Sequence, residues 1–338
     1  MCFQPRTSPS IKILLLLSLI LLLVSLAACQ NLGPTVTPTV NEAKSSTAQP
    51  TWQDTLMPSV QPSANLPDEA PSVSPFPSSS PSPSQTPDPD SVYYPAGRVS
   101  IPLLMYHNIS DHGDNRYITT ISSFRAEVET LYQNGNHTIT VSQLADVIRN
   151  GGYLPLNPVV LTFDDGYLGV YENAFPILKE YGYVGVMYVI TDTLGTDKAY
   201  GYVQNKELIE LVKAGWEIGS HSISHSDLKL SKLGMRNEIV NSRETLETLL
   251  GIKVRSFAYP YGAANAWTRE RIEEYGYDSA VGTDILITHS PKSLYYLSRR
   301  EVPRSITQND FLALLRPGKF EIAGFPLIKL TLTVIPTP

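Results

Sequence analysis

The C-terminal part of this 338-residue chain is predicted to form an α/β domain built on a parallel sheet or barrel. Strand-like apolar segments alternate there with helical segments, and this alternation is typical of parallel strands joined by covering helices. Residues 159–163 are apolar on both faces, as in a strand buried between two layers. The segment is about 240 residues long, a length that suits one barrel or two small domains.

The predicted elements follow one another along the chain without an internal repeat. Strands are expected at residues 101–106, 159–163, 184–190, 216–219, 254–259 and 279–281. One helix is expected to be capped by Ser122 or Ser123 and to run to Asn134, and another to start at Ser142. Further helices are expected to end at Tyr181 and to cover 205–214, 231–250 and 268–275. Residues 325–335 are apolar enough for a packed edge strand.

The first 29 residues indicate a secretory signal rather than a folded segment. A basic start precedes an apolar run at residues 13–28, which is shorter than the roughly 20 residues of a membrane-spanning helix. The run ends in LAAC at 26–29, which resembles the bacterial lipobox. Residues 1–29 are therefore predicted to be a lipoprotein signal peptide, with Cys29 as the lipidated anchor at the extracellular face of a bacterial membrane. An uncleaved N-terminal anchor is the alternative.

Residues 30–97 are predicted to be a disordered tether rich in Pro, Ser and Thr. They carry about half of the chain's 27 prolines and show no hydrophobic period. Such a segment buries too little apolar surface to offset the entropy of ordering, and its prolines favour an extended spacer. The folded domain is accordingly expected to cover residues 98–338.

Charge and cysteine content exclude several functions. Acidic residues outnumber basic ones 32 to 26, so the net charge is −6, and nucleic acid is not an expected partner. Both cysteines, Cys2 and Cys29, precede the domain. The domain is therefore expected to contain no disulfide, no catalytic thiol and no thiolate zinc site. The oligomeric state is left open.

Two groups of polar residues follow predicted strands. Asp164 and Asp165 come directly after residues 159–163, where two adjacent carboxylates are costly unless a metal relieves their repulsion. A simple Asp-Gly turn is the alternative. His221 and His225 follow residues 216–219, and two histidines at this spacing can share a metal, or can be polar loop residues.

The two groups together favour a catalytic metal site. Both lie at strand ends of one βα fold, which is where active sites of such folds form. Asp165, His221 and His225 would make a site of two histidines and one carboxylate that keeps positions open. A metal there would lower the pKa of bound water toward neutral, so that the water could lose a proton and attack a carbonyl.

Three segments in this order resemble the polysaccharide deacetylase family (NodB-homology, carbohydrate esterase family 4). They are TFDDGY at 162–167, HSISH at 221–225 and FAYPYG at 257–262. PLLMYH at 102–107 is similar to the first strand of the permuted poly-N-acetylglucosamine deacetylase-like subgroup. The resemblance implies a distorted (β/α) barrel and metal-dependent removal of acetyl groups from sugars.

The resemblance also implies roles for individual residues. Asp164 would be the general base, and Asp165 with the two histidines would hold a divalent metal, most often Zn²⁺, with Co²⁺ or Ni²⁺ as alternatives. Tyr261 would offer its backbone N–H to the oxyanion, and His107 would protonate the leaving amine.

One position departs from the family pattern. Ala258 stands where many members have the arginine that holds the catalytic aspartate. Arg299, in SRRE at 298–301, is the candidate replacement, and a solvated basic pair is the alternative.

The expected substrate is an acetylated polysaccharide, with an N-acetylglucosamine polymer favoured. The alternatives are an O-acetyl esterase acting on a xylan-type polymer and a catalytically weak glycan-binding lipoprotein. Four aromatic residues near the motifs are candidates for sugar contacts: Tyr167, Tyr259, Tyr261 and Trp267. His112, His137 and His289 are expected at the surface or in loops.

Overall fold

The computed structural model describes residues 90–195, 201–230 and 234–317, all within one compact unit that covers residues 79–338. The signal, the lipobox, most of the tether and the strand expected at 325–335 lie outside the described residues. None of the helices described has both the length and the apolar character of a membrane-spanning segment.

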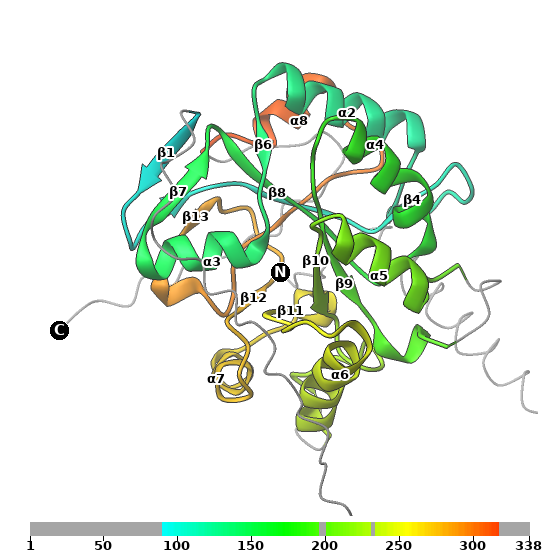
Figure 1. Cartoon of the computed structure of the whole chain (residues 1–338), viewed down its shortest axis with the longest axis vertical. Helices are drawn as coiled ribbons and strands as arrows, with labels where there is room; N and C mark the ends of the chain where they lie inside the picture. Colours follow the sequence, from blue (N-terminus) through cyan, green and yellow to red (C-terminus); the bar gives the residue numbers. More distant parts are fainter. Residues whose placement is uncertain (1–89, 196–200, 231–233, 318–338) are drawn as a thin grey trace, which may run out of the picture. The chain divides into compact units, whose positions relative to one another are not determined.

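A parallel sheet forms the centre of the domain (Figure 1). Its strands lie in the order β12-β11-β10-β9-β8-β3-β14, with β6 beside β8. Their bounds are β3 Leu103–Tyr106, β6 His137–Thr138, β8 Pro158–Phe163, β9 Val186–Val189, β10 Glu217–Ser220, β11 Ser256–Ala258, β12 Ser279–Val281 and β14 Arg300–Glu301. Leu297, just before β14, forms a parallel bridge to Val281 of β12, so the two end strands of the sheet are linked. The curled sheet confirms the distorted barrel that the motifs imply.

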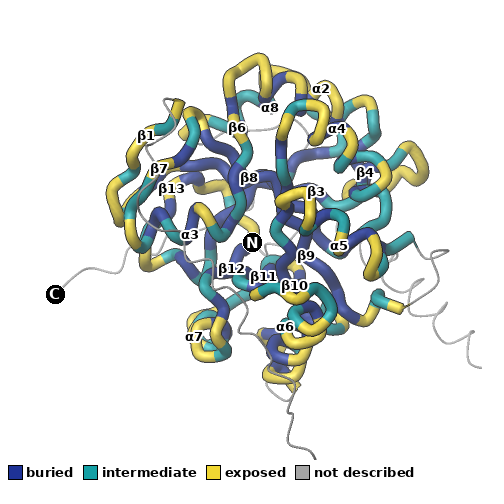
Figure 2. Tube along the Cα trace, in the orientation of Figure 1, coloured by how far each residue is buried: buried dark blue, intermediate teal, exposed yellow. Residues whose placement is uncertain are grey.

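Helices surround the sheet, with buried residues toward the strands and exposed residues outside (Figure 2). They are α2 Ile121–Gln133, α3 Val141–Asn150, α4 Phe175–Glu180, α5 Asn205–Lys213, α6 Met235–Leu250, α7 Ala266–Glu274 and α8 Gln308–Leu314. Shorter turns are η1 Val170–Ala174, η2 Thr191–Thr193, η4 Pro260–Gly262 and η5 Pro291–Ser293. Three small strand pairs complete the fold: β1 Ser91–Tyr94 with β7 Gly152–Pro155, β2 Val99–Ser100 with β13 Thr288–His289, and β4 Asn108–Ile109 with β5 Ile118–Thr119.

The first two helices start one or two residues earlier than the expected serines. The Thr120 hydroxyl caps α2 by accepting a hydrogen bond from Ser123 N at 3.2 Å. Thr140 caps α3 and forms a reciprocal capping box with Gln143. A capping hydroxyl must sit on the extended residue before the helix, and these threonines occupy that position, so the serines lie inside the first turn.

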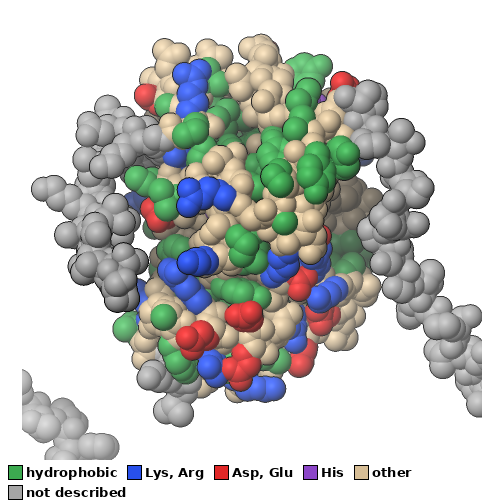
Figure 3. All heavy atoms as spheres, turned by 90° about the vertical axis from the view of Figure 1, so that its left-hand side faces the viewer, with side chains coloured by type: hydrophobic (Ala, Val, Ile, Leu, Met, Phe, Trp, Pro, Cys, Tyr) green, Lys and Arg blue, Asp and Glu red, His purple; other side chains and the backbone are tan. Residues whose placement is uncertain are grey.

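The ordered domain begins before the expected boundary at residue 98. Strand β1 pairs antiparallel with β7, and Gly97 N donates a hydrogen bond to Ile148 O at 2.9 Å. The residues Val92, Tyr93 and Tyr94 have high strand propensity, and pairing with β7 outweighs the proline-rich context that precedes them. Hydrophobic side chains gather on part of the face that carries this ribbon (Figure 3).

The alternation of side chains along β8 aims the first aspartate into the barrel. Val159, Leu161 and Phe163 belong to the cluster that packs against α2 and α4, whereas Val160 belongs to a second cluster with inward residues of the other strands. Thr162 shares the inward face with Val160 because side chains alternate along a strand. Asp164, two residues further on, therefore emerges on that same inward side.

Candidate metal centre and active site

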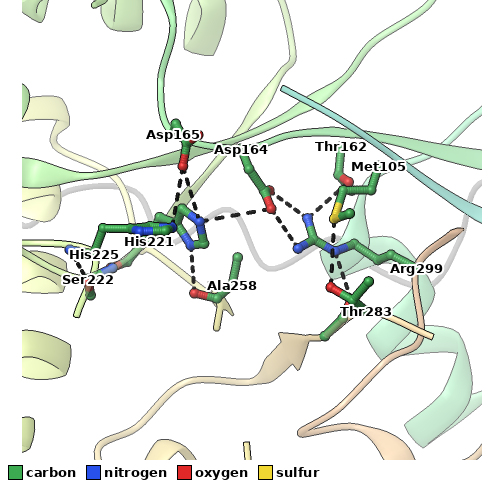
Figure 4. Close-up of polar contacts among 12 residues, drawn as sticks. Met105, Thr162, Asp164, Asp165, His221, Ser222, His225, Ala258, Thr283 and Arg299 are labelled. Carbon is green, nitrogen blue, oxygen red and sulfur yellow. Dashed lines mark hydrogen bonds and ion pairs between the residues drawn. The ribbon is translucent and has the colours of Figure 1, made fainter. Parts of the chain in front are cut away.

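The carboxyl end of β8 places two aspartates in different directions. Asp164 is 3% exposed and points into the barrel. Asp165 has φ 73°, in the left-handed region, and Gly166 follows with φ 79°. This turn directs the Asp165 carboxylate toward the end of β10 instead of the barrel axis (Figure 4).

The end of β10 brings two imidazoles to that carboxylate. His221 is 2% exposed, and its Nδ1 lies 2.8 Å from the Ala258 carbonyl oxygen, which leaves Nε2 to face the aspartates. Asp165 Oδ1 lies 3.5 Å from His221 Nε2 and 3.6 Å from His225 Nε2. One ligand atom from each of the three residues lies within 4.8 Å of the others.

The loop that carries the histidines is anchored by α6. The Glu238 carboxylate accepts hydrogen bonds from Ile223 N and Ser224 N, each at 2.9 Å, and from the Ser224 hydroxyl at 2.7 Å. His225 N donates to the Ser222 hydroxyl at 3.0 Å. Glu238 was not among the predicted site residues, although an acidic residue in the first turn of the next helix is a typical partner for unpaired backbone N–H groups.

Backbone strain concentrates at the same place. Among the residues described, five that are not glycine have positive φ, and four of these are Asp165, Ser222, His225 and Tyr261. Such conformations cost energy and persist where the surrounding structure enforces them, as at ligand sites. Their clustering here supports a functional site rather than an ordinary Asp-Gly turn and a polar loop.

Arg299 takes the position beside the base that Ala258 leaves empty. Its guanidinium donates to both Asp164 oxygens at 2.6 and 2.7 Å, to Thr162 Oγ1 at 3.1 Å and to the Gly282 carbonyl at 3.1 Å (Figure 4). Arg299 is 1% exposed and Arg300 is 2% exposed, so the alternative of a solvated basic pair is wrong. The pair follows the alternation of a strand, with Arg299 inside the barrel.

Charges in the site are arranged to suit a cation. Burial raises the pKa of Asp164, but Arg299 and His221 lower it to about 2, so this carboxylate stays ionised. Burial and the nearby Asp164 raise the pKa of Asp165 to about 7, and burial lowers the pKa of His221 to about 4. A carboxylate that ionises reluctantly beside neutral imidazoles is a donor set that a divalent cation would stabilise. Asp165, His221 and His225 therefore fit a divalent metal.

The remaining candidates complete one pocket. His107 and Tyr261 line a cavity of about 710 Å³ together with both aspartates and both histidines. Burial lowers the pKa of His107, while Asp164 and Glu301 oppose that shift. The Tyr261 backbone has φ 59°. The centroid of the exposed Tyr261 ring lies 4.4 Å from that of the His225 ring. Arg299 lies beneath this pocket, so the structure brings all seven sequence-predicted site residues together.

Two of the four aromatic candidates and one histidine lie elsewhere than predicted. Tyr259 is fully buried and donates to the Tyr295 carbonyl at 2.9 Å, and Trp267 packs against the core beside Arg271, so neither lines the pocket. His289 is 1% exposed in β13, not at the surface, because its edge strand pairs with β2 inside the fold. The pocket also includes Tyr117 and Glu301, which the motifs did not indicate, although Glu301 follows Arg299 at the two-residue spacing of a strand face.

Known proteins resemble this chain in sequence and fold. The family model for polysaccharide deacetylases matches residues 152–280. YxkH of Bacillus subtilis strain 168, assigned by name to the polysaccharide deacetylases, is 27% identical over 220 residues, which cover 65% of this chain and 77% of that protein. The poly-beta-1,6-N-acetyl-D-glucosamine N-deacetylase of Escherichia coli strain K12 is 25% identical over 224 residues, and the match spans 52% of this chain but only 32% of that relative.

A solved structure extends the comparison to the fold. The Streptococcus pyogenes deacetylase PplD, determined in complex with acetate, matches with a TM-score of 0.61 and 25% identity, and the match covers 65% of this chain and 99% of that one. The residues matched by the family model, 152–280, include all three motifs. This chain therefore resembles the polysaccharide deacetylase family, in sequence over residues 152–280 and in the fold of the domain.

Proposed function

We propose that this protein is a metal-dependent hydrolase that removes N-acetyl groups from a polymer of N-acetylglucosamine outside the cell. The observation that carries the proposal is the meeting of Asp165, His221 and His225 beside a separate carboxylate, Asp164, which Arg299 holds with two hydrogen bonds. A site that only bound glycan would have no need of a complete ligand set with its own buried base.

We assign the metal position to Zn²⁺ on the basis of its preference for imidazole and carboxylate ligands. A divalent metal held there would polarise the acetyl carbonyl and acidify a water molecule. His221 is oriented for this role by the Ala258 carbonyl, which accepts its Nδ1 proton and so presents Nε2 as the ligand atom.

The chain's own residues would move the protons of the hydrolysis. Asp164, kept ionised by Arg299, would accept a proton from the attacking water. The Tyr261 N–H would donate to the oxygen that becomes negative as the carbonyl is attacked. His107, directly after the neighbouring strand β3, would donate a proton to the nitrogen as its bond to the acetyl carbon breaks, so that acetate and a free amine are released.

The proposed substrate draws on the relatives. The Escherichia coli protein is named for poly-β-1,6-N-acetyl-D-glucosamine, and the match to it spans 52% of this chain. An ester-linked acetyl group would need the same residues, so acetylated xylan is a necessary comparison in the test.

The proposed location follows from the N-terminal sequence alone. LAAC at 26–29 would make Cys29 the lipid-anchored first residue, with residues 30–90 as a tether to the outer face of the membrane. A polymer in the cell wall or around the cell would then be within reach of the domain. Labelling with a radioactive fatty acid, lost in a Cys29→Ser variant, would test the anchor.

The decisive experiment is acetate release by the full-length protein in detergent, with and without a chelator. β-1,4- and β-1,6-linked N-acetylglucosamine oligomers and acetylated xylan would be compared side by side. Release from the oligomers that is abolished by chelator and restored by Zn²⁺ is expected. Release from xylan alone would assign an esterase instead, and retention of oligomers without any release would assign a binding protein.

A further inference from the structure

Tyr117 forms one wall of the pocket, and this residue lies outside all three sequence motifs. It lies just before β5, and its ring centroid is 4.7 Å from that of His107. The side chain lines the same pocket as the metal cluster, yet Tyr117 is 47% exposed. One part of the ring therefore covers His107 while another part remains open to the pocket.

An ion pair between Arg116, in the same loop as Tyr117, and Glu301 of β14 holds this wall in place. Arg116 donates three hydrogen bonds to the Glu301 carboxylate, at 3.2, 2.7 and 2.6 Å. The Arg116 guanidinium carbon lies 5.3 Å from the Tyr117 ring centroid. Two hydrogen bonds hold the Tyr117 main chain that carries the ring: Asn108 N donates to Tyr117 O at 3.1 Å, and Tyr117 N donates to Asn115 Oδ1 at 2.9 Å. A ring fixed before ligand arrives loses little entropy on binding.

The position of Tyr117 relative to the metal cluster and to His107 indicates which part of the substrate its ring contacts. The metal cluster stands at the ends of β8 and β10, whereas His107 and Glu301 stand at the ends of β3 and β14 on the other side of Asp164. A proton donor must face the nitrogen that leaves. The sugar that carries this nitrogen therefore extends over the β3 and β14 side, which is where Tyr117 lines the pocket.

We propose that Tyr117 is a specificity-determining residue whose ring packs on the apolar C–H face of the pyranose that bears the acetamido group. Arg116 is a positioning residue that holds the ring through Glu301. The proposal rests on the proposed function, and it predicts selection of glycan oligomers over small acetyl compounds that lack a sugar ring. Neither Arg116 nor Tyr117 belongs to a motif by which the family resemblance was drawn.

The test compares an N-acetylglucosamine oligomer with 4-nitrophenyl acetate in steady-state kinetics on the full-length protein. Tyr117→Ala is expected to raise KM for the oligomer about tenfold, and to lower the ratio of kcat/KM for oligomer to that for aryl acetate by a similar factor. Tyr117→Phe keeps the ring and is expected to recover most of the loss. Arg116→Ala should raise the same KM about threefold, because the ring remains but is held less firmly.

Arg125→Ala is the matched control. Arg125 also donates two hydrogen bonds to one carboxylate, that of Glu180, and it is similarly exposed, but it lies on α2 and does not line the pocket. It should leave the oligomer KM at the wild-type value. Thermal melting of every variant shows whether a change in KM comes from misfolding.

Three results would overturn the assignment. A Tyr117→Ala variant with unchanged oligomer KM would show that the ring makes no sugar contact. A fall in kcat without a rise in KM would mean that the ring acts only by orienting His107. Equal losses for Tyr117→Phe and Tyr117→Ala would assign the effect to the hydroxyl.

Calorimetric binding of the oligomer separates this inference from the proposed function. If wild-type protein binds oligomer without releasing acetate and Tyr117→Ala weakens that binding about tenfold, the proposed function fails while the sugar contact stands. If acetate release is normal and binding is insensitive to Tyr117, the function stands and the assignment of Tyr117 fails.

Discussion

Two regions of this domain each bury one histidine and one arginine, but only one of the two regions combines them with the carboxylates of a candidate active site. Inside the barrel, His221 Nε2 lies 3.5 Å from Asp165 and Arg299 holds Asp164. Outside it, His289 Nε2 contacts the Ile101 carbonyl at 3.0 Å and Arg300 donates to backbone carbonyls, including that of Leu314 at 2.6 Å. Burial lowers the pKa of both histidines to about 4.

The difference lies in what faces the buried group. His221 keeps one nitrogen for two carboxylates, whereas His289 Nδ1 finds no hydrogen-bond partner among the protein atoms described. Arg299 and Arg300 are neighbours in sequence, but their side chains have different partners. Arg299 meets the Asp164 carboxylate, whereas Arg300 donates to backbone carbonyls at the end of α8. A shifted pKa thus marks burial in both regions, and a site arises only where carboxylates converge.

The largest expected contrast is between substitutions of the two histidines. His221→Ala should lose the bound metal and reduce acetate release on the order of a thousandfold or more, because a ligand atom is removed. His289→Gln should keep one metal per chain, since it lies outside the cluster. Metal analysis and acetate assays on both variants check this. A His221→Ala protein that keeps its metal and its activity would remove the basis of the comparison.

The two arginines should separate turnover from stability. Arg299→Ala leaves a buried carboxylate unpaired, which is expected to cost about 3–5 kcal/mol in the free energy of unfolding. It should also lower kcat about a hundredfold because the base is no longer held in position. Urea unfolding and acetate release at saturating substrate measure the two effects.

Arg300→Ala should lose stability alone, by about 1–3 kcal/mol, because buried carbonyls lose donors. Its kcat per folded molecule should match the wild type. A hundredfold loss of kcat in this variant would show that the outer region also serves the chemistry.

His289 predicts acid destabilisation that does not involve the pocket. Its pKa is lowered in the folded state to about 4, so between pH 6.5 and 4 the unfolded chain binds the extra proton. Stability is therefore fully present above pH 6.5 and falls as the pH drops toward 4, by about 3 kcal/mol in total. Urea unfolding from pH 7 to pH 4 should show a shallower loss for His289→Gln. An identical slope would show that His289 titrates normally.

A substitution at a helix cap far from both regions shows how large a loss in the free energy of unfolding is when no site residue is involved. Thr140→Ala removes the hydroxyl of the α3 capping box and should lower the free energy of unfolding by about 1 kcal/mol, without changing kcat. Thermal melting with an activity assay measures this. Ser142→Ala is the comparison at the residue first expected to start the helix, and a larger loss there would reverse the assignment of the cap.

The sequence was sufficient for most of the sheet and for the metal cluster, because both depend on local patterns. The apolar run of β8 and the residues directly after it set the strand, its inward face and the position of Asp164 and Asp165 together. The elements missed were short or lacked a period. They are helix α8 and the strands β1, β2, β4, β5, β6, β7, β13 and β14. Pairing with a distant partner creates such strands, and this information is not present in a window of a few residues.

Local sequence determined which residue types stand at each strand end, since strand alternation and turn chemistry act over a few residues. Tertiary structure alone decided which of them meet. Closing the sheet between β12 and β14 brought Arg299 within 2.6 Å of Asp164, 135 positions away in the chain, and so filled the place of the arginine missing at Ala258. It also placed Tyr117 against His107 and buried His289, because contacts between distant segments depend on how the barrel closes and not on the pattern of either segment.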